Sequence, residues 1–329
     1  MKVIDMHCDT FMHLFEERQQ GVNTINLKAN ELHIDIAKMK KGDYLLQNFA
    51  MFLDLTETDN PYEDCKKMIA IFNEQMELCR DEIGVVRKFS DIEDNLKAGK
   101  LNAMLTMEEG APIKGSIETL QEFYDLGVRM LTLTWNYNNE IGHPNFIQTK
   151  ADTVNGFDCT QVNTKDGLTK AGIEIVKKME EIGMIVDVSH GSDALFKDIL
   201  THTTKPFVAS HSNARAVCNH SRNLPDEFII ALANRGGVMG MNYCQSFISD
   251  KKFTYVADII KHIKHIKNIA GVDCIGLGSD FDGISSRLEM KDASMMPMLC
   301  EELKKQQFTE DEIEKIFYKN VLRVYKEAL

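Results

Sequence analysis

Short apolar segments rich in β-branched residues alternate with stretches of helical periodicity along almost the whole chain. Strands are predicted at residues 3–7, 45–53, 102–107, 130–134, 184–189, 207–210, 238–243 and 274–278. Helices are predicted over 62–79, 116–126, 168–181, 192–200, 226–234, 254–269 and 309–327. This alternation predicts parallel strands that are joined by helical crossovers.

The number of predicted strands favours a (β/α)8 TIM barrel, which closes eight parallel strands inside a ring of helices. A doubly wound open sheet would show the same alternation, so strand count alone does not decide the fold. No repeat, low-complexity tract or linker composition marks a boundary, and a single domain over 1–329 is predicted. The long polar connections at 54–61 and 135–163 follow strands, and in a barrel such loops surround the active-site mouth.

The charge balance narrows the range of partners. The chain has 50 acidic and 38 basic residues, which gives a net charge of −12 at pH 7. Such a chain repels nucleic acid and anionic lipid, and no cluster of Lys or Arg reverses this locally. No run approaches the ~18 apolar residues of a membrane span, and the N-terminus lacks the apolar stretch of a signal peptide. We therefore expect neither a nucleic-acid nor a membrane partner.

The cysteines indicate a compartment. All eight are far apart, and none forms a C-x-x-C pair. This spacing favours reduced thiols over a disulfide framework or a cysteine-rich zinc module. A cytoplasmic location is the resulting prediction.

Polar residues cluster at the end of the first predicted strand, where Asp5, His7 and Asp9 occur. A charged group in a strand buried on both faces is costly unless it is paired. His7 and Asp9 are two residues apart, so their side chains project to the same side of an extended chain. One short segment could thus supply two ligands to one cation.

The same pattern recurs after other predicted strands. Glu108, His190, His211 and Asp280 each follow a strand directly or closely. In a barrel these ends converge on one mouth, which would gather three imidazoles and three carboxylates. This donor set suits zinc or a similar transition ion, and a shared carboxylate can bridge two ions.

Nucleophilic catalysis is the main alternative at the level of residue types. Cys8 lies between two candidate ligands, but its side chain should point away from His7 and Asp9. Ser189 and Ser210, which precede His190 and His211, should likewise face away from the cluster. We therefore interpret Cys8 as a packing residue.

Six motifs together resemble the membrane (renal) dipeptidase family of zinc metallopeptidases, in the wider amidohydrolase-like group. They are DMHCDT (5–10), LTMEEGAPI (105–113), LGVRMLTLTWNYNN (126–139), DVSH (187–190), SHSNARAVCNHSRNLPD (210–226) and GLGSDFDG (276–283). Their order and spacing cover nearly the whole chain. The resemblance implies hydrolysis of dipeptides, including those with a D-residue at the C-terminal position, by a hydroxide that bridges two zinc ions.

The resemblance also implies roles for individual residues. His7 and Asp9 would bind one zinc ion, His190 and His211 the other, and Glu108, rather than Glu109, would bridge both. Asp280, rather than Asp282, would move protons, and Arg222 would bind the substrate carboxylate. The family's known members further suggest a homodimer.

One position departs from the family pattern. Many members carry a histidine after the fourth strand that contacts the reacting substrate, and Trp135 occupies that position here, followed by Asn136. Both are predicted substrate-binding residues, and an indole could form a wall of the pocket. Two alternatives stay open: another amide or lactam hydrolase, such as a D-aminoacylase or lactonase, and a non-catalytic metal-binding scaffold.

Overall fold

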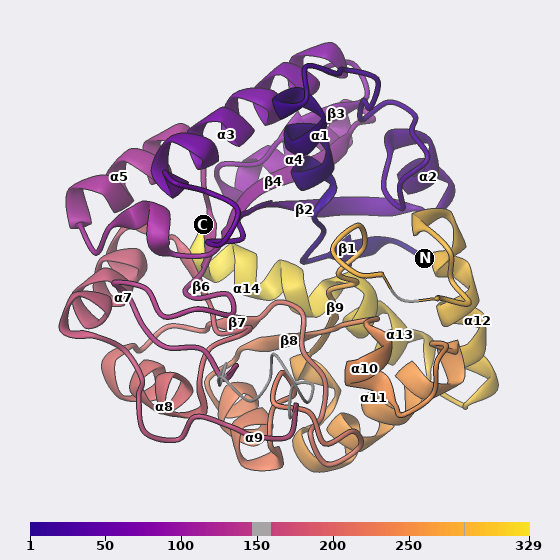
Figure 1. Ribbon diagram of the computed structural model, residues 1–329. Coiled ribbons are helices and arrows are strands. Elements are labelled where there is room, and N and C mark those ends of the chain that lie inside the picture. Colours follow the sequence, from indigo (N-terminus) through magenta and orange to yellow (C-terminus); the bar gives the residue numbers. More distant parts are fainter. Residues whose placement is uncertain (147–158, 286) are drawn as a thin grey trace.

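Parallel strands close into a barrel with helices outside it, as Figure 1 shows for the computed structural model. The structure describes residues 1–146, 159–285 and 287–329. The strands are β1 (Val3–Asp5), β2 (Tyr44–Phe52), β3 (Ile83–Val85), β4 (Leu101–Glu108), β5 (Met130–Thr132), β6 (Ile185–Asp187), β7 (Val208–Ala209), β8 (Val238–Met241) and β9 (Ile275–Leu277). They pair in the order β2-β1-β9-β8-β7-β6-β5-β4, and β2 pairs with β4 to close the ring. The predicted TIM barrel is confirmed.

One strand in the described part of the chain was not predicted. β3 pairs with the start of β4, where Ile83 lies opposite Leu101. β5 pairs with the end of β4, where Thr106 lies opposite Met130. Because β2 pairs along the full length of the other edge of β4, β3 and β5 share one edge. β3 thus pairs with the first residues of β4, on the edge whose later residues pair with β5. The barrel itself consists of the eight predicted strands.

Helices lie between the strands and cover the barrel (Figure 1). Those predicted from the sequence are α3 (Pro61–Leu78), α5 (Ile117–Leu126), α7 (Lys170–Ile182), α8 (Asp193–His202), α9 (Asp226–Asn234) and α11 (Val256–Ala270). The predicted helix over 309–327 is α13 (Glu310–Glu314), a π-helical turn (Lys315–Lys319) and α14 (Asn320–Ala328). Not predicted were α1 (Thr10–Gln19), α2 (Ile36–Lys41), α4 (Phe89–Lys97), α10 (Gln245–Ile248) and α12 (Met296–Lys305). No helix of the described chain is long and apolar enough to cross a membrane.

Local signals explain where several of these helices begin. The side chains of Asn60, Ser116 and Ser192 each accept a hydrogen bond from a backbone N–H in the first turn of α3, α5 and α8. These bonds satisfy donors that a helix start otherwise leaves unpaired. At the other end, Gly127 follows α5 with a φ of 115°, which a residue with a side chain rarely adopts.

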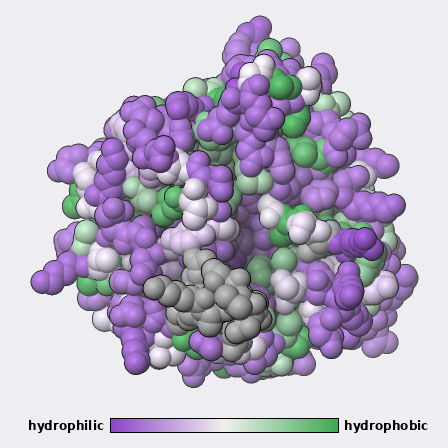
Figure 2. Space-filling model, viewed as in Figure 1, coloured by the Kyte–Doolittle hydropathy of each residue, from purple (hydrophilic) through white to green (hydrophobic). Residues whose placement is uncertain are grey.

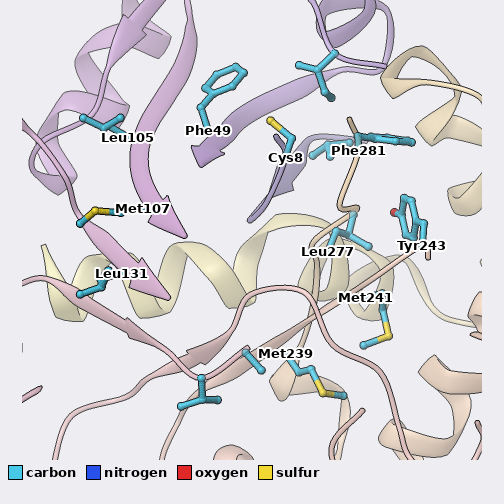
Figure 3. Packing of buried hydrophobic residues seen from close by; sticks show 14 of the residues in the cluster. Cys8, Phe49, Leu105, Met107, Leu131, Met239, Met241, Tyr243, Leu277 and Phe281 are labelled. Atoms are coloured by element: carbon cyan, nitrogen blue, oxygen red, sulfur yellow. The ribbon is translucent and has the colours of Figure 1, made fainter. Parts of the chain in front are cut away.

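Alternate strand residues pack on the two sides of the barrel wall. Phe49, Leu105 and Met239 point outward toward the helices, as Figure 3 shows. A second cluster packs inside the barrel against α14, and there the hydroxyl of Tyr325 accepts a hydrogen bond from Nδ2 of Asn48 at 2.7 Å. α14 thereby covers the end of the barrel at which the strands begin, and the opposite end stays accessible.

Candidate metal centre

The polar residues predicted at the strand ends converge at the carboxyl end of the barrel. Glu108 is the last residue of β4, whereas His7 follows β1, His190 follows β6 and His211 follows β7. All four are at most 8% exposed, and Asp9 is 2% exposed. Because their strands are neighbours in one closed sheet, residues far apart in the sequence lie side by side.

Glu108 lies at the centre of this cluster. Its Oε2 is 3.2 Å from Nε2 of His7. Its Oε1 is 3.0 Å from Nε2 of His190 and 3.2 Å from Nε2 of His211. Oδ2 of Asp9 lies 3.3 Å from Nε2 of His7. The two oxygens of this carboxylate thus face different histidines: Oε2 faces His7, and Oε1 faces His190 and His211.

Several observations show that this cluster fits metal ions. Three groups of potential ligand atoms lie within 4.8 Å of one another: His7, Asp9 and Glu108; Glu108, His190 and His211; and His7, His211 and Asp280. Both ring nitrogens of His7 and Oδ1 of Asp9 are buried without a hydrogen-bond partner among the described residues. Buried polar atoms without partners are costly, and imidazole with carboxylate is a donor set that zinc prefers.

Glycine keeps space open beside two of these carboxylates. A Cβ at Gly283 would lie 2.0 Å from Oδ2 of Asp9 and 2.7 Å from Oδ1 of Asp280. Such contacts are far inside van der Waals distance, so any side chain here would displace one of the carboxylates. Gly283 therefore preserves the room in which a ligand of these oxygens can lie.

The electrostatics divide the histidines into two kinds. Burial lowers the pKa of His7, but the adjacent carboxylates of Glu108 and Asp9 outweigh it and raise this pKa well above its usual value. Burial, with the positive charge of Arg222, lowers the pKa of His190 to about 4. Burial and the charge of His7 hold the pKa of His211 well below its usual value. His190 and His211 are accordingly neutral near pH 7, the form in which imidazole binds a metal.

The carboxylates also differ from one another. Burial raises the pKa of Asp9 to about 8, although the charge of His7 opposes this. Burial works in the same direction on Glu108, but the histidines that surround it dominate and hold its pKa well below the usual value. Glu108 is therefore the carboxylate with the most stable negative charge in the cluster.

Two buried aspartates hold the segments that carry the histidines. Oδ1 of Asp5 accepts hydrogen bonds from the backbone N–H groups of His7 and Ser279. Oδ1 of Asp187 accepts corresponding bonds from Ser189 and Ser210. Each aspartate thus ties its own strand end to the next strand, and this limits where the following histidines can lie.

Hydrogen bonds also orient the imidazole rings. Oγ of Ser210 lies 2.8 Å from Nδ1 of His211 and 2.5 Å from Oδ2 of Asp187. Oδ1 of Asn136 lies 2.9 Å from Nδ1 of His190. Ser210 was expected to face away from the cluster, and its hydroxyl does lie on the side of the His211 ring away from Glu108, where it contacts Nδ1. The sequence carries no local signal for this contact, which depends on how the ring is turned.

Cys8 follows the prediction made for it. Its side chain is fully buried in the hydrophobic core, and its Sγ donates to the backbone oxygen of Asn48 at 3.4 Å. Burial raises the pKa of this thiol well above its usual value. A thiol with these properties is a poor nucleophile, so Cys8 is a packing residue.

Asp280 and Asp282 occupy different environments. Oδ1 of Asp280 lies 4.0 Å from Nε2 of His7, and its Oδ2 accepts a hydrogen bond from Asn242 at 2.8 Å. Asp282 instead accepts from the hydroxyl of Thr10 and the backbone of His33. Burial raises the pKa of Asp280, as does the charge of Glu108. Asp280 alone of the two contributes to the cavity described next.

A cavity of about 420 Å³ opens onto the cluster, and Figure 2 shows the hollow at the centre of this face. It is lined by Asp9, Met12, Glu16, Phe52, Asp54, Glu57, Glu108, Trp135, Asn136, His190, Cys244, Phe247, Asp280, Gly283, Ile284 and Ser285. Residues from both long loops predicted at the mouth are among them, although 147–158 of the second loop lie outside the described residues. The sequence predicted Trp135 in this lining but not Met12, Phe52 or Phe247, which lie outside the six motifs.

The predicted substrate-binding residues differ in how they meet the cavity. The ring of Trp135 forms part of the wall, 4.9 Å from the ring of Phe52 between centroids and 6.1 Å from that of His190. Arg222 is 6% exposed and is not among the lining residues; one of its guanidinium nitrogens donates to the backbone oxygen of His211 at 3.2 Å. Its Nε is buried without a hydrogen-bond partner among the described residues. A cation beside the histidines is thus available to an anionic group.

Comparison with known proteins gives the family. The family described as membrane dipeptidase (Peptidase family M19) matches residues 1–329. The chain belongs to this family. An uncharacterized dipeptidase of Schizosaccharomyces pombe is 32% identical over 355 residues, which cover 99% of this chain and 80% of that protein. As a family member, the chain is a zinc metallopeptidase that hydrolyses dipeptides.

Solved structures show the same fold. A metallopeptidase of Rhodobacter sphaeroides, bound to a phosphinate mimic of the dipeptide L-Ala-D-Ala, matches 100% of this chain and 99% of its own with a TM-score of 0.91 and 22% identity. A second metallopeptidase, described as a dipeptidase of the same family, matches 100% and 98% of the two chains with a TM-score of 0.89 and 23% identity. This dipeptidase therefore has its family's barrel over its whole length.

Proposed function

We propose that this dipeptidase holds two zinc ions, one between His7 and Asp9 and the other between His190 and His211, with Glu108 shared by both. The observation that carries the proposal is the position of Glu108, whose Oε2 faces His7 while its Oε1 faces His190 and His211. Bound there, zinc would lower the pKa of a water molecule and polarise the scissile carbonyl.

Asp280 is the proposed proton carrier. It lines the cavity next to the metal site, and burial raises its pKa toward the range in which a carboxylate can accept and return a proton. It would take a proton from the attacking water and deliver it to the leaving amine. The hydrogen bond from Asn242 to Oδ2 fixes the carboxylate and leaves Oδ1 directed toward His7.

Arg222 is the proposed partner of the substrate carboxylate. Its buried guanidinium carries an unpaired Nε and lies close enough to His190 to lower the pKa of that ring. A planar guanidinium binds carboxylate through two parallel hydrogen bonds. Trp135 would form the wall against which a substrate side chain packs, and Asn136 would contact the substrate beside it.

The proposed substrates are dipeptides, including those with a D-residue at the C-terminal position. The cavity of about 420 Å³ is of the size that holds small ligands. The relative from Rhodobacter sphaeroides binds a mimic of L-Ala-D-Ala, which is such a substrate. A D-aminoacylase or a lactonase would need the same metals but not a free amino group in its substrate.

Metal analysis together with a substrate panel tests this function. The purified protein should contain close to two zinc equivalents per chain, and the zinc-loaded enzyme should hydrolyse L,L- and L,D-dipeptides. N-acetylated amino acids and lactones serve as the comparison. One zinc equivalent at full activity would contradict the binuclear centre, and faster turnover of acylated amino acids would favour an aminoacylase.

Assembly and location remain predictions. All eight cysteines lie among the described residues and none is in a disulfide, which agrees with the reduced thiols expected in the cytoplasm. A homodimer is proposed from the family resemblance, and light scattering coupled to size-exclusion chromatography would measure it.

A further inference from the structure

Asn136 lies in the wall between two cavities. It lines the cavity over the metal cluster and also a neighbouring cavity of about 480 Å³. Its Oδ1 is 2.9 Å from Nδ1 of His190, whose Nε2 is 3.0 Å from Glu108 and 3.1 Å from Nε2 of His211. The carboxamide of Asn136 is therefore separated from the centre of the cluster by the width of one imidazole ring.

The ring of His190 determines which way this carboxamide faces. If Nε2 binds a metal, the ring proton resides on Nδ1, which then needs a hydrogen-bond acceptor. Oδ1 of Asn136 is that acceptor, and this places the Nδ2 amino group on the side of the carboxamide away from Nδ1. The hydrogen bond thus orients both residues.

Within the described part of the chain, the side chain of Asn136 makes a hydrogen bond only through Oδ1, and Nδ2 makes none. Nδ2 is also absent from the set of fully buried polar atoms that lack a partner. Nδ2 is accordingly not fully buried, and Asn136 as a whole is partly exposed. The acidic residues that line the cavity near the cluster, Asp9, Glu108 and Asp280, offer oxygens that accept hydrogen bonds. The Nδ2 amino group of Asn136 is an uncharged hydrogen-bond donor beside these acidic residues, and it is therefore suited to donate a hydrogen bond to an oxygen of the substrate.

We infer that Asn136 acts twice in the proposed reaction: Oδ1 holds the ring of His190, and Nδ2 donates a hydrogen bond to the oxygen of the scissile carbonyl. This inference rests on the proposed function. As water adds to the carbonyl carbon, negative charge develops on that oxygen, and a fixed donor stabilises the charge more than it stabilises the substrate. Asn136 is a positioning residue toward His190 and a catalytic residue toward the substrate.

Asn136→Asp separates the two roles. The aspartate keeps an oxygen that accepts from Nδ1 of His190, and it replaces the N–H donors by a second oxygen. We expect zinc affinity, measured by competition with a chromophoric chelator, to be equal to or higher than that of the wild type. We expect kcat to fall by about 10²–10³, as for the loss of one oxyanion donor, and affinity for a phosphinate dipeptide mimic to fall in parallel.

Asn136→Ala removes both groups, so it should lower zinc affinity by about 10–100-fold as well as kcat. Asn138→Asp is the matched control: Asn138 is exposed and lines only the neighbouring cavity, and it should keep wild-type kcat with the same added charge. Trp135→Phe tests the rival donor, because it removes the indole N–H from the same wall. Thermal unfolding of each variant verifies that it is folded.

Each arm can overturn part of the inference. A kcat within about threefold of wild type in Asn136→Asp would overturn the donor role, and the indole would take that role if Trp135→Phe alone lost activity. Unchanged zinc affinity in Asn136→Ala would overturn the positioning role. A zinc-loaded wild type that cleaves no dipeptide would overturn the proposed function and the donor role with it, while the chelator competition would still decide the role toward His190.

Discussion

Glu108 and Glu109 are adjacent in the chain, but their carboxylates lie in different environments. Glu108 faces the three imidazoles of the cluster. Glu109 has a φ of 95° and accepts hydrogen bonds from the backbone N–H groups of Ala111 and Trp135. Burial raises its pKa to about 7. Glu109 therefore holds the loops after β4 and β5, whereas Glu108 is placed to bind metal.

Substitution of the two glutamates should have different effects. Glu108→Gln removes the negative charge that faces His7, His190 and His211. We expect it to lower the amount of bound zinc and to reduce kcat/KM by more than about 100-fold, which is the largest loss usual for a residue that only hydrogen-bonds a metal ligand. Glu109→Gln should lower the melting temperature but keep two zinc equivalents and kcat/KM within about tenfold. Zinc content and steady-state kinetics provide the measurement. The reverse pattern would assign the shared ligand to Glu109.

Ser210→Ala should weaken zinc binding without touching a proposed ligand. It removes the hydroxyl that links Nδ1 of His211 to Asp187, and loss of such a partner costs about 10–100-fold in metal affinity. Ser212→Ala is a close control, because Ser212 is equally buried two residues away and its hydroxyl has no hydrogen-bond partner among the described residues. Equal zinc affinity in the two variants would show that Ser210 does not orient the ring.

The Asp280→Asn variant should still bind zinc, but its kcat should be much lower than that of the wild type. The amide cannot carry a proton between water and the leaving amine, so kcat should fall by about 10²–10⁴, the contribution of general acid–base catalysis. Asp280 also belongs to one of the groups that could hold an ion, which makes zinc content the informative second measurement. Loss of one zinc equivalent would make Asp280 a ligand, and an unchanged kcat would rule it out as the proton carrier.

The neighbouring aspartate provides the comparison for this experiment. Asp282→Asn disturbs contacts with Thr10 and His33 away from the cavity. It should therefore reduce stability, seen as a lower melting temperature, and leave kcat within about tenfold of the wild type. A large loss of kcat in a folded, zinc-loaded Asp282→Asn would contradict the distinction between the two residues.

His262 should make stability fall at acid pH. It lies buried in α11, where Nδ1 accepts from the backbone of Ala214 and Nε2 faces the backbone oxygen of Ile248. Burial lowers its pKa from 6.5 to about 4, so the unfolded chain binds this proton more readily than the folded one. Its contribution is therefore complete above pH 6.5 and is lost as pH falls toward 4, by up to about 3 kcal/mol.

Chemical denaturation at several pH values measures this effect. The free energy of unfolding of the wild type minus that of His262→Gln should decrease between pH 6.5 and 4, whatever the cost of the substitution at pH 7. The difference removes contributions from the metal cluster, which both proteins share. A difference that stays constant over this range would show that His262 is protonated as easily in the folded chain as in the unfolded one.

Residues next to strand ends could be predicted because their position follows from local pattern. His7, Glu108, His190 and His211 each come after an apolar segment, and parallel strands in a barrel begin and end together. That rule brings the four side chains to one end of the molecule without knowledge of any contact. The strand β3 escaped prediction; its segment Ile83–Val85 contains a glycine and is only partly buried, so it lacks the continuous apolar pattern of the barrel strands.

The order of apolar and polar residues by itself thus determined the barrel, because each apolar segment is driven to bury its surface in the same way. The same order determined the end of the barrel at which the ionisable side chains gather. The family resemblance chose Glu108 over Glu109, and the tertiary structure shows the physical difference between them: Glu108 faces the histidines, whereas Glu109 accepts backbone hydrogen bonds. Only the tertiary structure decided that Ser210 and Asn136 orient the rings of His211 and His190. These outcomes depend on side-chain rotation and on hydrogen bonds between distant segments, and no local pattern in the chain encodes those.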